Sequence, residues 1–235
     1  CGNKCLKQNQ CCGNNQCTGA NAGNCVNNRC RAAFRTCTAG RGRVAFVSGP
    51  ANPPNSKGSV RFTVGPEDAT GDWAHLRFNE FAGVALEDIT SLRYSVFVRP
   101  LNDGTCPHHN PYIALYVTHE GSEDIIVSTN LRPNPDGCNS WQFLDVASSA
   151  GRWWMPTNPG FAPLSDPRPL SDFITEFPGI AIRNATTTDT QCPGAVGGLR
   201  LEAGEWPGGG GTGNSVSHVS FLRVATKSGA RMFRF

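Results

Sequence analysis

The amino-acid sequence predicts an all-β fold: an antiparallel β-sandwich or jelly roll with one short helix, preceded by a small disulfide-rich module. Three observations lead to this prediction. Eight of the eleven cysteines fall within the first 37 residues. Beyond them, short segments alternate apolar and polar residues with the two-residue period of a half-buried strand. Glycine and proline, present 27 and 17 times, separate these segments as tight turns require.

The first 37 residues contain too few apolar side chains to form a hydrophobic core, so covalent cross-links must stabilise them. Their cysteine spacing lacks the paired knuckles of zinc sites, and no histidine accompanies it. We therefore expect disulfides, which persist in oxidising compartments, and a secreted, extracellular protein. The cysteines of this expected module are Cys1, Cys5, Cys11, Cys12, Cys17, Cys25, Cys30 and Cys37.

The stretch from Cys1 to Cys17, with its adjacent Cys11 and Cys12, resembles the knottin and Dickkopf/colipase-like cysteine modules of extracellular proteins. It is also similar, more distantly, to hevein-type chitin-binding modules, which bind chitin with a serine and a cluster of aromatics. Because the module contains no Tyr or Trp and only Phe34, the resemblance favours a structural or protein-contact role over chitin binding. The chain begins at Cys1, and we expect that processing removed a signal peptide; a lipid-bearing N-terminal cysteine is the alternative.

The glycine-rich, basic segment 38–43 is expected to link this module to a sandwich domain at 44–227, followed by a tail at 228–235. The tail alternates in a way that suits strand addition to another chain, so self-association stays open. Alternation predicts strands at 43–48, 59–64, 73–78, 91–98, 112–119, 124–128, 141–146, 198–203 and 216–225.

Other local signals complete the expected sandwich. The segment 119–123 contains Glu and Gly between two alternating runs and predicts a hairpin turn. A single helix is expected at 170–177, with Ser171 as its N-cap and Pro178 ending it. We expect the last strand to return and pair with an early one.

Three cysteines lie within the expected sandwich. Cys106 precedes the strand at 112–119, and Cys138 precedes the strand at 141–146. If both strands belong to one meander, the two cysteines lie at the same end of a sheet, and we expect a Cys106–Cys138 disulfide. Cys192 stays an alternative partner for either. Because eleven is odd, one thiol is left over or pairs outside the chain.

Four segments resemble a β-sandwich found in secreted bacterial proteins and comparable to carbohydrate-binding domains. The resemblance covers residues 44–226 and implies a location and a jelly-roll fold, but it supplies no catalytic residues. The segments are Ile89–Ser95, Trp141–Gln142, Gly151–Trp154 and Gly197–Gly204.

Three tryptophans are candidates for binding a glycan, because an indole packs well against the apolar face of a sugar ring. Trp153 and Trp154 are adjacent, so a strand would point one inward and the other to solvent. Trp206 lies in a loop too rich in glycine to bury itself. Packing in the core or over a loop is the alternative for each. Asn184 begins an N-glycosylation sequon, which has meaning in a eukaryotic source.

Metal sites receive little support from the sequence. His108 and His109 lie in a loop, but the extended strand that follows would hold His119 about 25–30 Å away. The loops at 102–104 and 134–136 contain Asn and Asp, which suit a calcium ion or a plain turn. We expect no cofactor, with calcium as the alternative.

A polysaccharide-active enzyme of jelly-roll fold is the alternative to a binding module. Glycoside hydrolysis needs two opposed carboxyl groups, whereas neighbours such as Glu123 and Asp124 point to opposite faces of a strand. A lyase would use Tyr or His as base and Arg to neutralise a uronate. The residues that could serve a lyase are Tyr94, Tyr112, Tyr116, Arg77, Arg93 and Arg99.

The sequence thus favours a secreted, non-enzymatic module that binds a polysaccharide or an extracellular protein at a cell surface, in a matrix or in an assembly. A structural subunit of such an assembly is the third alternative. The basic residues are scattered and the net charge is +3, so no nucleic-acid partner is expected. No apolar run is long enough to span a membrane.

Overall fold

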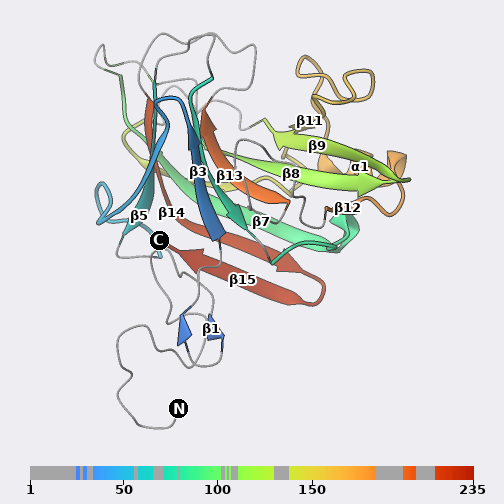
Figure 1. Ribbon diagram of the computed structural model, residues 1–235, viewed down its shortest axis with the longest axis horizontal. Coiled ribbons are helices and arrows are strands. Elements are labelled where there is room, and N and C mark those ends of the chain that lie inside the picture. The colour runs from blue at the N-terminus through green and yellow to red at the C-terminus, as the bar shows by residue number, and fades with distance from the viewer. Residues whose placement is uncertain are drawn as a thin grey trace.

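The computed structural model describes residues 25–26, 29–30, 34–55, 58–65, 71–78, 80–101, 104, 106, 111–129, 138–183, 198–204 and 215–235. Within these ranges the chain forms two large antiparallel sheets, a separate two-stranded sheet of β1 and β2, one α-helix and a short 3₁₀ helix (Figure 1). No helix among the described residues is long and apolar enough to cross a membrane.

The elements follow one another in this order. The first strands are β1 (Cys25–Val26), β2 (Arg29–Cys30), β3 (Phe34–Ala39), β4 (Arg43–Val47), β5 (Ser59–Val64) and β6 (Trp73–Phe78). The 3₁₀ helix η3 (Leu86–Asp88) precedes β7 (Ile89–Val98), β8 (Tyr112–His119), β9 (Ser122–Ser128), β10 (Trp141–Asp145) and β11 (Trp153–Trp154). The chain continues with α1 (Leu170–Glu176), β12 (Ala181–Ile182), β13 (Leu199–Gly204), β14 (Ser215–Thr226) and β15 (Gly229–Arg234).

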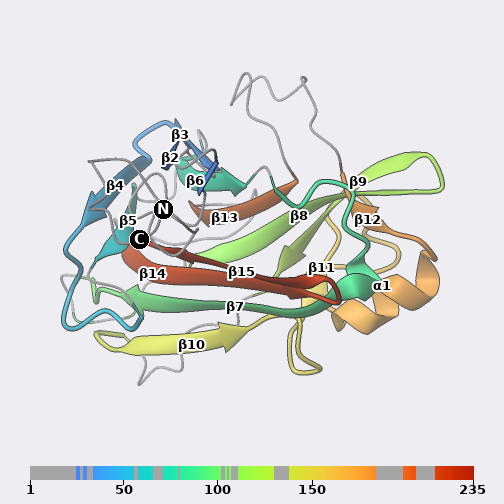
Figure 2. The ribbon, with the colours of Figure 1, turned by 90° about the horizontal axis from the view of Figure 1, so that it is seen from below.

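One sheet has six strands, with the order β10-β7-β14-β5-β4 and β15 paired to β14. The long strand β14 pairs with β5 through its first half and with β15 through its second half. Figure 2 shows β10, β7, β14 and β15 side by side. The last long strand therefore pairs with an early one, as the sequence predicted.

The other sheet has seven strands, with the order β11-β9-β8-β13-β6-β3 and β12 paired to β8. Strand β13 joins two distant parts of the sequence, because it pairs with β6 on one side and with β8 on the other. Helix α1 lies at one end of the molecule, near β12 (Figures 1 and 2).

The core fills the space between the two sheets. Several strands, such as β5, β6, β8 and β13, contribute alternate residues to it, as half-buried strands do. Phe62 comes from β5, Leu76 from β6, Leu115 from β8 and Leu222 from β14, and all four side chains are fully buried. The chain is an antiparallel β-sandwich of jelly-roll type, which confirms the predicted fold class.

Local signals in the sequence account for the β8–β9 hairpin and for part of helix α1. Glu120 and Gly121 have φ values of 48° and 81°, the positive pair that a tight two-residue hairpin turn requires. The helix lies where it was predicted, but Ser171 is not its N-cap. Pro169 occupies the cap with extended backbone, and the Ser171 hydroxyl donates to Asp172 within the first turn.

The sandwich extends beyond the limits expected from the sequence. Residues Phe34–Ala39, assigned to the cysteine-rich module and linker, form β3 and pair with β6. Residues 228–235, expected as a tail available to another chain, instead supply the second strand of a hairpin in which β15 pairs with β14. Phe233 and Phe235 insert into the core, which explains why this segment folds back on its own sheet.

Two cysteine observations concern the disulfide framework. Cys106 and Cys138 form a disulfide with their Cα atoms 5.7 Å apart, the pair favoured from the sequence. The meander behind that expectation is wrong, because β10 pairs with β7 of the six-stranded sheet. The end of β7 and the start of β10 are paired neighbours, and this brings the two cysteines together. Cys37 on β3 is also disulfide-bonded.

Most of the expected cysteine-rich module lies outside the described residues. This applies to Cys1, Cys5, Cys11, Cys12 and Cys17, while the segments containing Cys25 and Cys30 pair as β1 and β2. The knottin-like and hevein-like resemblances therefore stay expectations.

Candidate functional site

The outer face of the seven-stranded sheet carries a group of large polar and aromatic side chains. On β6, Ala74, Leu76 and Phe78 point into the core, so the residues between them point outward. The same alternation applies to β8, β11 and β13. We call the resulting set the polar face; it consists of Trp73, His75, Arg77, Tyr112, Tyr116, Trp154, Arg200 and Glu202.

Strand register arranges six of these residues in two adjacent rows, and Trp73 and Tyr116 lie outside these rows. In the first row, Arg77 is opposite Arg200, and the row continues through Ala114 and Val127 to Trp154. In the second row, His75 is opposite Glu202, and Glu202 is opposite Tyr112. Directly opposed side chains in such rows lie about 5 Å apart, so the groups can act on one ligand together.

The charged members of the polar face are buried although they point away from the core. Arg77 is 1% exposed, Arg200 is 7% exposed and Glu202 is 4% exposed. Burying charged groups costs free energy, and buried charges are ordinarily paired with other charged or hydrogen-bonding groups. Tyr112, Tyr116 and Trp154 are half-buried, so the aromatic rings are the accessible part of this face.

His75 is the most unusual residue of the polar face. Its side chain is fully buried, and its ring stacks on Trp73 with ring centres 4.8 Å apart and planes 4° from parallel. Neither ring nitrogen has a hydrogen-bond partner among the described residues. Burial, with the positive charges of Arg200 and Arg77, holds the pKa of His75 well below its ordinary value. The imidazole is therefore neutral, and its two ring nitrogens are buried.

Three guanidinium groups surround the ring of Tyr116. The Arg200 guanidinium carbon lies 4.1 Å from the ring centre, with Arg183 at 5.0 Å and Arg77 at 5.1 Å. Such cation–π contacts each contribute about 0.5–2 kcal/mol, more when desolvated. Arg183 follows β12, and its backbone N–H donates to the Tyr116 carbonyl oxygen. The orientation of Tyr116 is therefore fixed by its neighbours.

In the second row, the carboxylate of Glu202 lies beside the phenol of Tyr112. A guanidinium nitrogen of Arg200 lies 3.6 Å from a carboxylate oxygen of Glu202. Burial, followed by the negative charge of Glu202, raises the pKa of Tyr112 well above its ordinary value. Tyr112 therefore keeps its proton at neutral pH, and its hydroxyl is buried beside Glu202.

The tryptophans predicted as glycan-binding residues separate in the structure. Trp153 is fully buried and donates from its indole nitrogen to the Val146 carbonyl oxygen at 2.8 Å, so it belongs to the core and is not a binding residue. Trp154 points to the opposite side and lies at the end of the first row. The adjacent pair thus faces opposite sides of the sheet, as strand geometry requires. Trp206 lies outside the described residues.

The histidines and loops considered for metal binding form no metal site among the described residues. His119 contacts Asp124 at 2.6 Å and packs on Phe177, so it is engaged at the sandwich edge. No group of three metal-binding side chains occurs in the part of the chain that the structure describes. Several other candidates fall outside the described residues. They are His108, His109, Asn184, Cys192, the segment 134–136, and Asn102 and Asp103 of the segment 102–104.

The residues considered for a lyase fall on both sheets. Arg77, Tyr112 and Tyr116 belong to the polar face, whereas Tyr94 is buried in the core and donates to the Pro111 carbonyl oxygen at 2.8 Å. Arg93 lies on the six-stranded sheet and pairs with Asp145 there, and Arg99 follows the same strand.

The outer face of the six-stranded sheet offers a second, simpler surface. Phe143 is 63% exposed, and its ring centre lies 6.0 Å from that of Phe221. A hollow of about 670 Å³ lies beside them and is also lined by Arg93, Asp145 and Arg223. Arg93 pairs with Asp145 at 2.6 Å. This surface presents one exposed ring, that of Phe143, and lacks a buried charged row among the described residues.

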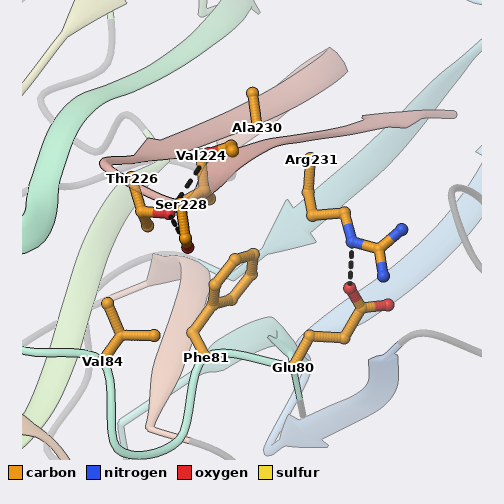
Figure 3. Close-up of a pocket in the computed structure, with 9 residues that line it drawn as sticks. Glu80, Phe81, Val84, Val224, Thr226, Ser228, Ala230 and Arg231 are labelled. Carbon is orange, nitrogen blue, oxygen red and sulfur yellow. Dashed lines mark hydrogen bonds and ion pairs between the residues drawn. The ribbon is translucent and has the colours of Figure 1, made fainter.

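A pocket of about 590 Å³ lies between the β14–β15 hairpin and the turn that follows β6 (Figure 3). Phe81 faces Ser228 and Thr226 of the hairpin, and Arg231 points toward Glu80, whose carboxylate lies 3.1 Å from the guanidinium. Burial raises the pKa of Glu80, and the charge of Arg231 offsets this only in part. This pocket offers one ring, that of Phe81, and one ion pair, between Glu80 and Arg231. The polar face offers more groups that could bind a ligand.

Sequence reasoning missed four members of the polar face: Trp73, His75, Arg200 and Glu202. The sequence does contain a signal for these residues. In both β6 and β13, large polar or aromatic residues alternate with the core residues. The pairing of β13 with β6, which joins segments more than a hundred residues apart, is needed to bring these residues together.

No protein-family model matches the chain, and no curated protein matches it. Among solved structures, the chain is similar to the family 11 carbohydrate-binding module from Clostridium thermocellum in complex with a β-1,3-1,4-mixed-linked tetrasaccharide. The identity is 9% and the TM-score 0.41, over 83% of this chain and 90% of that module.

Two further similarities are of the same order. The family 11 module of a cellulosomal cellulase of Clostridium thermocellum has 9% identity and a TM-score of 0.38, over 87% of this chain and 89% of that one. An arabinose-bound α-L-arabinofuranosidase has 12% identity and a TM-score of 0.37, over 86% of this chain and 23% of that enzyme. At such low scores, these similarities say nothing about the ligand of this chain.

Proposed function

We propose that this protein is a secreted, non-enzymatic module that binds a polysaccharide on the polar face of its seven-stranded sheet. The observation that supports this proposal is the register that aligns Arg77, Arg200 and Trp154 in one row, beside a second row of His75, Glu202 and Tyr112. Binding sites for sugars combine accessible aromatic rings with a few fixed polar groups, and the polar face contains both kinds of group.

Each part of the polar face has a role in this proposal. Tyr116 and Trp154 are half-buried rings that can pack against the apolar face of a sugar. The neutral His75 and the protonated Tyr112 belong to the second row and are the uncharged hydrogen-bonding groups of this face. Five strand spacings separate β3 from β11 along the first row, a width of about 24 Å that accommodates several sugar rings of a chain.

The extracellular location in this proposal is supported by disulfide chemistry. Cys106 and Cys138 are joined, and Cys37 is also disulfide-bonded. Disulfides of this structural kind persist in oxidising compartments, where polysaccharides of cell surfaces and matrices are found.

Retention of the purified protein on a panel of immobilised polysaccharides tests the proposal. Trp154→Ala should abolish or strongly reduce retention on the ligand that the unmodified protein binds. Phe143→Ala is the matched control, because it removes an exposed ring from the opposite sheet. If Phe143→Ala abolishes retention while Trp154→Ala does not, the site lies on the other sheet. Retention by no polysaccharide at all contradicts glycan binding.

A polysaccharide lyase is a second candidate, favoured by the position of the neutral His75 in one row with Glu202 and Tyr112. In β-elimination a base removes the proton beside a uronate carboxyl, a carbon–carbon double bond forms, and the bond to the next sugar breaks as its oxygen leaves with the bonding electrons and takes up a proton. The new unsaturated ends absorb ultraviolet light. Their release, lost in His75→Gln or Tyr112→Phe, would establish a lyase and overturn the non-enzymatic proposal.

A further inference from the structure

The outer face of the six-stranded sheet carries the most exposed large apolar side chain in the described part of the chain. Phe143 of β10 is 63% exposed, and its ring centre lies 6.0 Å from that of Phe221 on β14. The hollow of about 670 Å³ beside the two rings is also lined by Leu144 and Met232. An exposed apolar patch that borders a hollow is typical of a surface that another molecule covers.

A β-bulge in β14 places Phe221 on this outer face. Val219 and Leu222 both point into the core, so two residues, and not one, separate successive core positions of the strand. The register of β14 against β7 shifts at the same point. Bulges redirect a side chain from the regular alternation of a strand and are common beside functional sites. The irregularity of β14 is therefore what brings the second ring next to Phe143.

The loop that forms one wall of the hollow is held in place by the chain itself. The Ser220 hydroxyl, in the bulge, donates to the Pro54 carbonyl oxygen at 2.6 Å. The indole nitrogen of Trp141 donates to the Pro50 carbonyl oxygen at 3.2 Å. Asn55 of the same loop lines the hollow. A surface that is already fixed in this way binds a partner without a further cost of ordering.

The charge of the six-stranded sheet is strongly one-sided. Its strands contain six arginines but a single acidic residue, Asp145. Two of the arginines, Arg93 and Arg223, are directly opposed on β7 and β14 and line the hollow. Arg234 of β15 is opposite Phe221. The four strands that carry these groups lie side by side in Figure 2.

Asp145 is already engaged within the sheet. Its carboxylate accepts hydrogen bonds from the Arg93 side chain at 2.6 Å and from the Leu92 backbone N–H at 3.3 Å. The side chains of Arg223 and Arg234 are partly exposed and form no ion pair with the described part of the chain. Partly exposed arginines are solvated and stable without a partner. They do, however, determine which charge is favourable in a molecule that covers Phe143.

These groups favour a protein segment over a glycan. Sugar hydroxyl groups need acceptors as well as donors, but the polar side chains around the hollow are arginines, Asn55 and the engaged Asp145. Phe, Met and Arg are enriched at protein–protein interfaces. The complementary molecule is an apolar side chain with carboxylates on either side. The apolar side chains that it would meet are Phe143, Leu144, Phe221 and Met232.

We infer that this surface is a docking site for an acidic segment of a partner protein. An apolar side chain of the segment packs on Phe143 and Phe221, and neighbouring carboxylates pair with Arg223 and Arg234. Arginine suits this role because two parallel N–H groups can bind both oxygens of a carboxylate. The docking site lies on the sheet opposite the polar face, so the inference is independent of polysaccharide binding.

Selection from a library of short random peptides, displayed on phage and bound to the immobilised full chain, tests the inference. We expect the selected peptides to carry Asp or Glu beside an aromatic or aliphatic residue. A synthetic copy should bind about tenfold more tightly than the same peptide with Asn and Gln in place of its acids, and more weakly as salt rises. Selection of no peptide, or equal binding of the acidic and amide forms, would overturn the inference. Displacement of Phe143-dependent binding by alginate but by no acidic peptide would identify a glycan as the occupant and overturn it as well.

Variants locate the docking site. Phe143→Ala should weaken binding of the synthetic acidic peptide about tenfold, and Arg223→Gln should weaken it severalfold. Neither side chain belongs to the core, so both variants should fold. Leu164→Ala is the matched control for an exposed apolar side chain, and Arg35→Gln for an exposed arginine on the opposite sheet.

The pattern of losses separates this inference from the proposed function. Peptide binding that survives Phe143→Ala and Arg223→Gln, or that is lost equally in the two controls, would show that the docking site is not on this surface. Retention on a polysaccharide should be the same in Phe143→Ala as in the unmodified protein. Each proposal can therefore fail while the other holds.

Discussion

The guanidinium carbon of Arg200 lies 4.1 Å from the centre of the Tyr116 ring, on the face of the sheet that points away from the core. Arg77 and Arg183 approach the same ring at 5.1 and 5.0 Å. A single aromatic ring thus organises three cations from three parts of the chain. Without the ring, three positive groups would be held near one another with no shared partner.

The first prediction concerns this ring. Tyr116→Leu should lower the free energy of unfolding by about 1–3 kcal/mol, because the arginines lose their cation–π contacts while their mutual repulsion stays. Tyr116→Phe keeps the ring face and should cost clearly less. Chemical denaturation measures the free energy of unfolding of both variants, provided that its dependence on denaturant concentration is the same in each. A Phe variant as unstable as the Leu variant would show that the hydroxyl, and not the ring, stabilises this region.

The second prediction separates the adjacent tryptophans. Trp153→Ala should destabilise the fold by about 3–5 kcal/mol, because it empties a fully buried site and leaves the Val146 carbonyl without its indole donor. Trp154→Ala, one residue later, should change stability by less than about 1 kcal/mol. Thermal and denaturant unfolding measure both. Comparable losses in the two variants would contradict the assignment of Trp153 to the core and Trp154 to the binding face.

Those two residues also show what sequence could and could not predict. Adjacent residues on a strand must face opposite sides, so the sequence predicted that one indole would be buried, but it did not say which. That choice depends on the pairing of β11 with β9, which places Trp153 over the core. Strand positions followed from local alternation, and the β8–β9 turn from its glycine.

The polar face depended on long-range pairing. His75 and Glu202 become neighbours only because β13 returns to lie beside β6. The outward residues of each strand were visible in the sequence, but the row that they form together was not. The same reason explains β15: its alternation suits strand pairing, and only the position of β14 decides that the partner is its own chain.

The third prediction concerns Glu80 beside the β14–β15 hairpin. Burial raises its pKa, so the ionised carboxylate is destabilised in the folded chain despite the nearby Arg231. A raised folded-state pKa in a carboxyl group means that stability is full below the unfolded pKa and is lost as pH rises through the folded pKa. Glu80→Gln should therefore be more stable than the unmodified protein at pH 7, and the difference should vanish near pH 4. A less stable Gln variant at pH 7 would mean that the ion pair with Arg231 outweighs burial.

The last prediction is the acid sensitivity of His218 on β14. Its ring nitrogen lies 3.1 Å from the Ser59 hydroxyl, and the side chain is 1% exposed. Burial, with the charges of Arg99 and Arg61, lowers the pKa of His218 to about 4. The folded chain therefore holds the ring neutral, whereas the unfolded chain takes up a proton below about pH 6.5.

Because the folded pKa lies below the unfolded one, His218 supports stability above pH 6.5 and loses it as pH falls toward 4. The loss is on the order of 3 kcal/mol for a shift of this size. Denaturant unfolding between pH 7.5 and pH 5, where few carboxyl groups titrate, measures about 2 kcal/mol of this loss. His218→Asn should flatten the curve over that range, while His119→Asn, at the sandwich edge, serves as the control. If the His218→Asn curve falls as steeply as that of the unmodified protein, the ring is not held neutral by the fold.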